Sequence, residues 1–221
     1  MKKQILLFAS VALSTFVMAQ TKTSVGIRAG LSSSTLKGDA VSSLQNVLNF
    51  SNGAITTNSN TGFFAGATLS IPVNEMFSVE PALYYSQKGY QLNGSLTVKG
   101  AEFLSANAKA KLTSHYIDLP VVLKANISGF QIFAGPQISY LAKADLRTTA
   151  GALGFNIINT TTDASNQFNQ WDAGFTGGVG YKLSNGINIT AAYDHGLSKV
   201  NSGKSLEAYN RAFKVGIGMQ F

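Results

Sequence analysis

The sequence predicts an all-β protein, an eight-stranded antiparallel transmembrane β-barrel with short periplasmic turns and long extracellular loops. The first observation is the C-terminal segment, which alternates strictly, with Phe213, Val215, Ile217, Met219 and Phe221 on one side and polar or small residues on the other. The second is that other segments along the chain alternate in the same way. The third is that the connections between these segments are alternately short and long, as they are in outer-membrane barrels.

The N-terminus is typical of a secretory signal peptide. Two lysines precede an apolar run over residues 5–17, and small residues follow at the positions that signal peptidase reads. We expect cleavage between Ala19 and Gln20, which divides the chain into a signal peptide at 1–19 and an outer-membrane β-barrel domain at 20–221. An uncleaved membrane anchor is the alternative, and it is disfavoured because the apolar run is short for a membrane span.

The composition excludes several kinds of site. The chain has 221 residues and no cysteine, so it forms no disulfide and no thiolate metal site, and it cannot carry the lipid that bacterial lipoproteins attach to cysteine. Beyond the signal, no apolar stretch approaches the roughly 18 residues that a membrane helix needs. A membrane location therefore requires a closed barrel, in which every backbone polar group is paired.

The charge of the chain is basic. Its 17 Lys and Arg residues against 10 Asp and Glu residues give a net charge of +7. Without the two lysines of the signal, 15 basic residues against the same 10 acidic residues leave +5. We expect the anionic partner of an exported protein to be outer-membrane lipid, above all lipopolysaccharide phosphate, and not nucleic acid. Scattered solubilising charge is the alternative explanation.

Eight segments carry the period of two that a membrane-spanning strand requires. Each is close to the roughly 9–11 residues that a tilted strand needs to cross a bilayer. The segments are Ser24–Ser33, Thr61–Ile71, Phe77–Gln91, Leu112–Asn126, Phe130–Ala142, Trp171–Leu183, Ile187–His195 and Asn210–Phe221.

The connections between these segments support the same topology. The tight ones are 72–76, 128–129 and 184–186, and the long polar ones are 34–60, 92–111, 143–170 and 196–209. Short turns on one side and long loops on the other are typical of outer-membrane barrels. A soluble eight-stranded barrel of the lipocalin type is the alternative, and the regular alternation of loop lengths disfavours it.

Two of the long connections carry local predictions. In the first, Val41, Leu44, Val47 and Leu48 have helical spacing behind Asp39, a residue suited to an N-cap, so we expect a short helix over the barrel mouth. In the third, residues 157–162 are Ile, Asn and Thr, and we expect a flexible loop.

Aromatic residues gather at the ends of the predicted strands. Trp171, Tyr140 and Tyr193 lie toward the long loops, and Phe77, Phe130, Tyr181 and Phe221 lie toward the short turns. Two such groups predict aromatic girdles at the two membrane interfaces. The general preference of aromatic residues for strands is the alternative explanation.

Three prolines oppose the assignment of central strands. Pro81, Pro120 and Pro136 fall inside the third, fourth and fifth segments. Proline donates no ladder hydrogen bond and belongs at edges or bulges. We therefore expect a β-bulge at each of these positions.

Strand alternation places a balanced set of charges inside the barrel. These residues are Arg28, Lys124, Lys182 and Lys214 on the basic side, and Glu80, Asp118, Asp172 and Asp194 on the acidic side. An eight-stranded barrel is just wide enough for side chains to fill it, and an unpaired buried charge costs several kcal/mol. We expect a plug of lumen ion pairs. A proton or ion path along the same residues is the alternative.

No catalytic residue, cofactor or metal site is predicted. His195 directly follows Asp194, so the two side chains face opposite sides of a strand and cannot act as base and orienting group. The glycines between Gly174 and Gly180 lie within a strand, where they make room on the lumen side. The chain is therefore expected not to be an enzyme, with a lipid esterase or acyltransferase as the alternative.

Several stretches carry a family resemblance. They are Val25-Gly-Ile-Arg-Ala-Gly30, Tyr116-Ile-Asp-Leu-Pro-Val-Val-Leu-Lys124, Phe133-Ala-Gly-Pro-Gln-Ile-Ser-Tyr140, Asp172-Ala-Gly-Phe-Thr-Gly-Gly-Val-Gly-Tyr181 and Tyr193-Asp-His-Gly-Leu-Ser198. In this order they resemble the Bacteroidota outer-membrane β-barrel family that includes the PorT-like proteins, a family that carries the prolines of the second and third motifs. The resemblance implies a porin-like barrel, and PorT itself belongs to type IX secretion and gliding machinery.

The expected function is that of a non-enzymatic integral outer-membrane barrel with a structural or interaction role through its extracellular loops, which would meet a protein partner. The alternatives are a porin-like channel for small solutes and a PorT-type component of type IX secretion. The terminal aromatic matches the signal that the barrel assembly machinery reads, so Phe221 and the alternating residues before it would direct insertion.

Overall fold

The computed structural model describes residues 23–38, 55–98, 101–152, 155–200 and 207–221. The strands are β1 (Ser24–Lys37), β2 (Ile55–Pro72), β3 (Phe77–Val98), β4 (Ala101–Ile127), β5 (Phe130–Ala152), β6 (Phe155–Asp163), β7 (Trp171–Lys182), β8 (Ile187–Gly196) and β9 (Tyr209–Gln220). One turn of 3-10 helix, η2 (Ser165–Gln167), follows β6.

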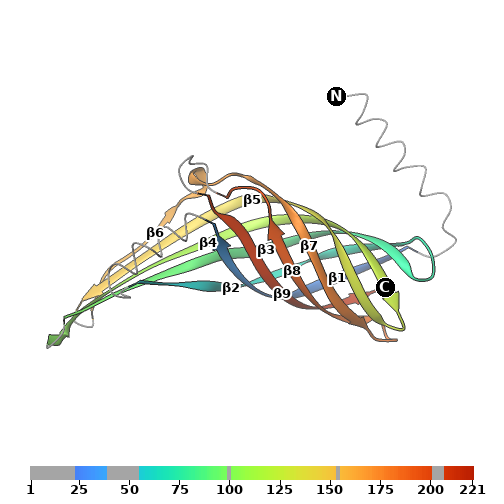
Figure 1. Ribbon diagram of the computed structural model, residues 1–221, viewed down its shortest axis with the longest axis horizontal. Coiled ribbons are helices and arrows are strands. Elements are labelled where there is room, and N and C mark those ends of the chain that lie inside the picture. Colours follow the sequence, from blue (N-terminus) through green and yellow to red (C-terminus); the bar gives the residue numbers. More distant parts are fainter. Residues whose placement is uncertain (1–22, 39–54, 99–100, 153–154, 201–206) are drawn as a thin grey trace, which may run out of the picture.

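Eight of these strands form a closed antiparallel ring (Figure 1). Each strand pairs with the next along the chain, β5 pairs with β7, and β9 closes the ring on β1 from Gly26↔Gln220 to Lys37↔Tyr209. The remaining strand, β6, pairs with the outer part of β5. The predicted eight-stranded antiparallel barrel is confirmed, and every predicted segment lies within one ring strand to within one residue.

Two of the expected long loops are strands instead. Residues 92–111 continue β3 and β4 as a hairpin that stays in register from Gln91↔Lys111 to Leu96↔Ala106. Residues 157–162, expected to be flexible, lie in β6 and pair with β5. Both segments mix polar and apolar residues without a clear signal of their own, and each hairpin supplies the cross-strand partner that makes such a segment a strand.

These strands project beyond the barrel as a sheet that we call the extension. It consists of residues 55–59, 90–98, 101–112, 143–152 and 155–163, in the strand order β2-β3-β4-β5-β6. Figure 1 shows it reaching away from the end of the barrel where the C-terminus lies. The extension therefore stands on the long-loop side of the molecule.

The prolines are accommodated without the expected bulges. Pro81 pairs with Val121, Pro120 pairs with Gln137 and Pro136 pairs with Phe175, and the register is constant through all three positions. The register shifts of the described strands lie elsewhere, among them one between His115 and Tyr116 of β4. A missing N–H removes one ladder bond but inserts no residue, which is why the ladder continues in phase.

The two faces of the barrel differ in polarity, as strand alternation requires. Outward side chains are large and apolar, and Ile27, Ile132 and Ile217 are 59%, 51% and 58% exposed. Inward side chains are polar and buried. An apolar outer band around a polar interior is the pattern of a barrel that stands in a lipid bilayer.

The tight connections have turn chemistry that explains their length. Ser128 and Gly129 both have positive φ angles, 52° and 89°, between the paired residues Ile127 and Phe130. Positive φ at both central residues is the requirement of the two-residue hairpin turn whose twist matches that of its strands. In another turn, the Asn74 side chain accepts hydrogen bonds from the backbone N–H groups of Met76 and Phe77.

Two predictions lie outside the described residues: the signal cleavage between Ala19 and Gln20, and the helix expected around residues 39–48. Within the part of the chain that the structure describes, no helix is long and apolar enough to cross a membrane.

Candidate functional site

The lumen of the barrel holds a first cluster of charges near the short turns. Glu80, which is 1% exposed, accepts a hydrogen bond of 3.1 Å from Arg28 Nη2 and forms a second ion pair with Lys124. Arg28 Nη1 also donates to the Tyr84 hydroxyl at 2.9 Å. One carboxylate is therefore shared by two cations that arrive from β1 and β4.

A second cluster lies further toward the long-loop side. Asp118, on β4 and fully buried, bridges Lys88 Nζ at 2.8 Å and Lys214 Nζ at 3.0 Å. Lys214 Nζ lies 2.6 Å from Asp194 Oδ2 as well. These contacts connect β3, β4, β8 and β9, so the cluster ties opposite walls of the barrel together.

The remaining two lumen residues predicted from sequence are less engaged. Asp172 is buried and accepts a hydrogen bond from Asn210 Nδ2 at 2.7 Å, while its other carboxylate oxygen has no hydrogen-bond partner among the described residues. Lys182 is half-buried at the end of β7 and forms no ion pair with a described residue. Six of the eight predicted residues form ion pairs with one another or with Lys88, Asp172 borders the same cavity as Lys88 and Asp194, and Lys182 pairs with neither group.

Sequence reasoning missed Lys88, one of the most buried cations, at 2% exposure. It lies on β3 at an even spacing from Glu80, so alternation alone assigns it to the lumen. Its Nζ also lies 4.7 Å from the centre of the Tyr116 ring, in cation–π geometry. The signal was present in the sequence, since Lys88 lies within the predicted segment Phe77–Gln91 and on the side that faces the lumen.

The two clusters carry opposite net charges. The cluster of Glu80, Arg28 and Lys124 has two cations for one carboxylate. The other has two cations, Lys88 and Lys214, for the carboxylates of Asp118, Asp194 and the adjacent Asp172. The lumen is balanced as a whole, and its charge is separated along the barrel axis.

Apolar side chains cover the lumen at the long-loop end. Leu112, Tyr116, Leu141 and Ala144 form a buried cluster, and a second cluster contains Leu36, Val200 and Ala208. Phe168, which follows η2, packs against both clusters. We call these residues the apolar cover.

Backbone hydrogen bonds hold the apolar cover over the mouth. Leu141 N–H donates to the Gln170 carbonyl at 2.7 Å, and Asn169 N–H donates to the Val200 carbonyl at 2.8 Å. Val200 N–H in turn donates to the Ala208 carbonyl at 2.8 Å. The segments after η2 and after β8 are thereby joined to each other and to the barrel wall.

The described lumen residues border two small cavities between these layers. A cavity of about 40 Å³ is bordered by Arg28, Glu80 and Lys214, and another of about 10 Å³ is bordered by Lys88 and Asp172. Asp118 bridges the cations of the two cavities and lies between them. Because one water needs roughly 10–15 Å³, the cavities have room for a few waters and for no larger solute.

The histidines lie outside the lumen. His115 Nδ1 is hydrogen-bonded to the Tyr85 hydroxyl at 2.5 Å, and its Nε2 lies 3.6 Å from Asp145. His195 is exposed and lies beside Tyr193 on the outer face of β8. In the described part of the chain, no group of three or more His, Asp or Glu residues is placed to hold a metal ion.

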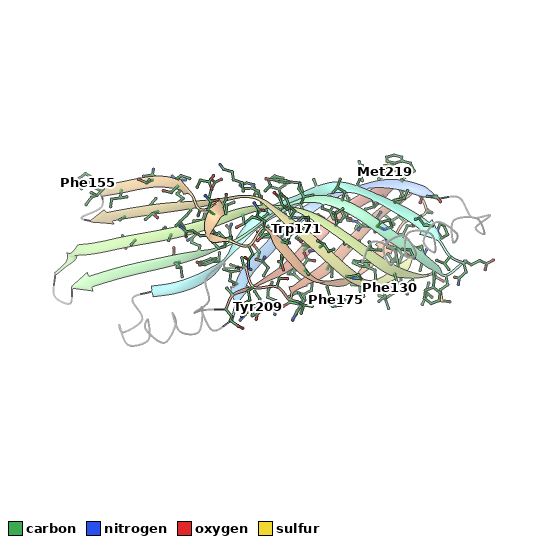
Figure 2. All side chains as sticks on the ribbon, turned by 90° about the horizontal axis from the view of Figure 1, so that it is seen from above. Phe130, Phe155, Trp171, Phe175, Tyr209 and Met219 are labelled. Carbon is green, nitrogen blue, oxygen red and sulfur yellow. The ribbon has the colours of Figure 1, made fainter. Side chains whose placement is uncertain are left out.

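The C-terminal strand occupies the closing position of the ring. β9 pairs with β8 on one side and β1 on the other, and Phe221 N–H donates to the Val25 carbonyl at 2.8 Å. Its five alternating apolar side chains point outward and are 41–70% exposed. They are Phe213, Val215, Ile217, Met219 and Phe221. Figure 2 shows Met219 on the outside of the barrel wall.

Several solved outer-membrane proteins have a similar arrangement of strands. Neisserial surface protein A is 13% identical, with a TM-score of 0.48, and the match covers 91% of this chain and 100% of that one. Ail, the attachment invasion locus protein of Yersinia pestis, is 12% identical, with a TM-score of 0.45 and the same coverage. OprG from Pseudomonas aeruginosa is 16% identical, with a TM-score of 0.41, over 90% of this chain and 95% of that one.

No curated protein matches the chain significantly. The family described as outer membrane protein beta-barrel domain matches residues 18–202, which is most of the chain and includes every ring strand except β9. This match agrees with the closed ring, the apolar outer face and the polar interior. The chain belongs to the outer membrane protein beta-barrel domain family.

Proposed function

We propose that this protein is a non-enzymatic barrel with a closed lumen, which acts as a structural or interaction protein through the extension on its extracellular side. The observation that supports this proposal best is the Asp118 bridge between Lys88 and Lys214. It connects opposite walls at a level where only small cavities remain, and the apolar cover lies above it. A solute would have to break both layers to pass.

Single-channel recording in a planar bilayer tests the closed lumen. The refolded barrel should give no discrete openings, while its heat-modifiable gel mobility shows that it is folded. The matched variant is Asp118→Ala combined with Phe168→Ala, which removes the bridge and part of the apolar cover. Reproducible openings of the unmodified protein would overturn the proposal and favour the porin-like channel, with the lumen charges setting ion selectivity.

The extension supports an interaction role. It presents two exposed sheet faces beyond the barrel, and on β6 Phe155 and Ile157 are 75% and 72% exposed. Figure 2 shows Phe155 near the far end of the extension, away from Trp171 on the barrel. Exposed apolar residues on a projecting sheet favour contact with another molecule. Pull-down with the whole protein against a version that lacks residues 92–111 and 145–163 would test this role.

A narrower role within type IX secretion rests on the resemblance to PorT-like proteins. A stable complex with other secretion components on purification from native membranes would support it, and purification as a lone barrel would oppose it. A lipid-modifying activity has weaker support, because His115 contacts Tyr85 and Asp145 and no serine hydroxyl of the described residues. His115→Ala with a lipid substrate tests that activity directly.

The proposal extends to two steps in the biogenesis of the barrel. We propose that cleavage after Ala19 releases the chain into the periplasm, and that the assembly machinery reads the outward aromatic and aliphatic residues of β9 that end on Phe221. The exposure of these side chains on the strand that closes the ring supports the second step.

A further inference from the structure

The outer face of the sheet changes character where the barrel becomes the extension. On β4, the outward side chains of the barrel wall include Leu119 and Ile117, and further along the same face come Lys111 and Lys109. The register between β3 and β4 is constant over this stretch, so the face does not switch sides. An outer face that bears lysines does not stand in the hydrocarbon of a membrane.

A bulge brings a third cation to this face. His115 pairs with Lys143 and Tyr116 pairs with Leu141, so Ala142 is an extra residue in β5. Beyond it the alternation of β5 is reversed, and Arg147 points outward as the direct cross-strand partner of Lys111. Bulges at barrel rims commonly redirect side chains in this way.

The three cations lie together without acidic partners. Like charges directly opposite on neighbouring strands destabilise a sheet, and Lys111 faces Arg147 in this position. None of Lys109, Lys111 and Arg147 forms an ion pair among the described residues. The nearby Asp145 is already engaged by Lys143 at 2.8 Å. A bound anion would remove this repulsion.

The surface between these strands is hollowed. A groove of about 450 Å³ is bordered by Lys109, Arg147, Thr149, Asn159 and Phe155. Arg147 Nε donates to Asn159 Oδ1 at 3.1 Å, which holds the guanidinium in the groove. Its Nη groups donate to no described residue, and a guanidinium with free Nη groups binds phosphate oxygens in a bidentate manner.

The height of the groove above the membrane identifies the anion. Tyr85 and Tyr140 both pair with Ile117, and Tyr140 packs on Trp171 at 5.1 Å between ring centres, so these aromatic residues mark the interface. Lys111 stands six residues beyond Ile117 on the same strand. At about 3.3 Å per residue and a tilt of about 45°, this is about 14 Å above the aromatic level.

We propose that Lys109, Lys111 and Arg147 form a binding site for the phosphorylated core sugars of the lipopolysaccharide that surrounds the barrel. The site lies on the outer face, above the level of the lipid head groups, where phosphate groups of the core stand. This proposal rests on the proposed interaction role of the extension in the outer membrane, and it names the partner chemistry.

The test uses the full barrel, refolded in zwitterionic detergent micelles and titrated with lipopolysaccharide of phosphorylated core at low ionic strength, with affinity measured by thermophoresis. The triple variant K109Q/K111Q/R147Q should lower the affinity about tenfold, since each exposed ion pair changes affinity by up to about fivefold. The control is Lys199→Gln, because Lys199 is half-exposed and paired with Glu207. It should stay within about twofold.

Two further arms separate a binding site from a structural role. Removing the phosphates of the same lipopolysaccharide with hydrofluoric acid should abolish the difference between the unmodified and triple-variant proteins. Without lipopolysaccharide, Lys111→Gln alone should unfold at the same or a higher urea concentration than the unmodified barrel, because it relieves the repulsion with Arg147.

Equal affinity of the triple variant and the unmodified protein would overturn the site, and so would an equal loss in Lys199→Gln. The outcome is independent of the closed-lumen proposal. If the unmodified barrel conducts ions and the triple variant loses affinity for lipopolysaccharide, the binding site stands and the closed lumen is refuted. If the barrel does not conduct and the triple variant keeps its affinity, the closed lumen stands and the binding site is refuted.

Discussion

Replacing Asp118 by asparagine tests the ion-pair plug at its centre. The change keeps the shape of the side chain and removes the negative charge that Lys88 and Lys214 share. Lys214 keeps Asp194 as a partner, but Lys88 keeps the Ser139 hydroxyl at 3.3 Å, the Tyr116 ring and only an indirect neighbour in Asp172, which borders the same cavity. The variant therefore leaves one buried ammonium group without a direct ion-pair partner among the described residues.

The magnitude follows from the cost of a buried charge that has lost its partner. Removing one partner of a buried ion pair costs about 3–5 kcal/mol. Because Lys214 keeps its contact with Asp194, we expect the free energy of unfolding to fall by about 3 kcal/mol. With a urea m-value of roughly 1–3 kcal/mol/M, the unfolding midpoint should fall by about 1–3 M. The second variant, Asp118→Asn with Lys88→Met, removes the stranded cation and should recover most of the loss.

The fluorescence of Trp171 reports the transition, because it is the single tryptophan of the chain and is 61% exposed on the outer wall. The control is Glu75→Gln in an exposed turn, which removes one carboxylate and should change the free energy of unfolding by less than about 0.5 kcal/mol. If Asp118→Asn has the midpoint of Glu75→Gln, the bridge does not hold the barrel walls together and the reasoning is wrong.

Three further predictions concern other parts of the molecule. On β7, Gly178→Ala should destabilise the barrel by about 1–3 kcal/mol and Gly177→Ala should not, because a Cβ would stand 2.2 Å from a neighbouring carbonyl oxygen at Gly178 and 3.5 Å from one at Gly177; matched urea titrations compare the two. On the extension, hydrogen bonds from Ser165 lower the pKa of Asp163. A lowered pKa adds stability above the ordinary value of about 4, and this stability is lost as the pH falls through the folded value. The protection factor of the Ser165 N–H against hydrogen exchange, which is corrected for the intrinsic rate, should therefore fall only in acid, and Asp163→Asn should abolish that pH dependence. Finally, Phe221→Ala should reduce the folded barrel in the outer membranes of cells but not the yield of refolding in detergent, and an equal loss in both would refute its role as an assembly signal.

Much of the fold could be predicted because its signal is local. Strand alternation is a property of a few neighbouring residues, and it placed every predicted segment inside a ring strand to within one residue, although several strands extend well beyond the predicted bounds. The same alternation assigned Arg28, Glu80 and Asp118 to the lumen, and it would have assigned Lys88. It could not say which of these charges meet, since Lys214 and Asp118 are 96 residues apart in sequence.

The extension was missed because its strands depend on partners. Residues 157–162 are two isoleucines followed by uncharged polar residues, and this short segment becomes a strand only because β5 pairs with it. For the three prolines the error is the opposite one, because a break in the ladder is predicted where the structure has a regular ladder. A proline lacks the N–H that the ladder needs, which predicts a bulge. In the structure, the two strands beside each strand that contains a proline keep a constant register with it through the proline.

A barrel with an apolar outside, a charged inside and an alternating C-terminal strand could be predicted from the chain, because these properties follow from a period of two along single strands. The ion-pair partners, the closure of the mouth and the position of Arg147 could not, because they depend on which strands meet in the folded barrel. Counted by simple alternation from the outward Tyr140, Arg147 would face inward. The extra residue Ala142 turns it outward beside Lys111. That bulge arises from how β5 pairs with β4, and no local pattern in the sequence marks it.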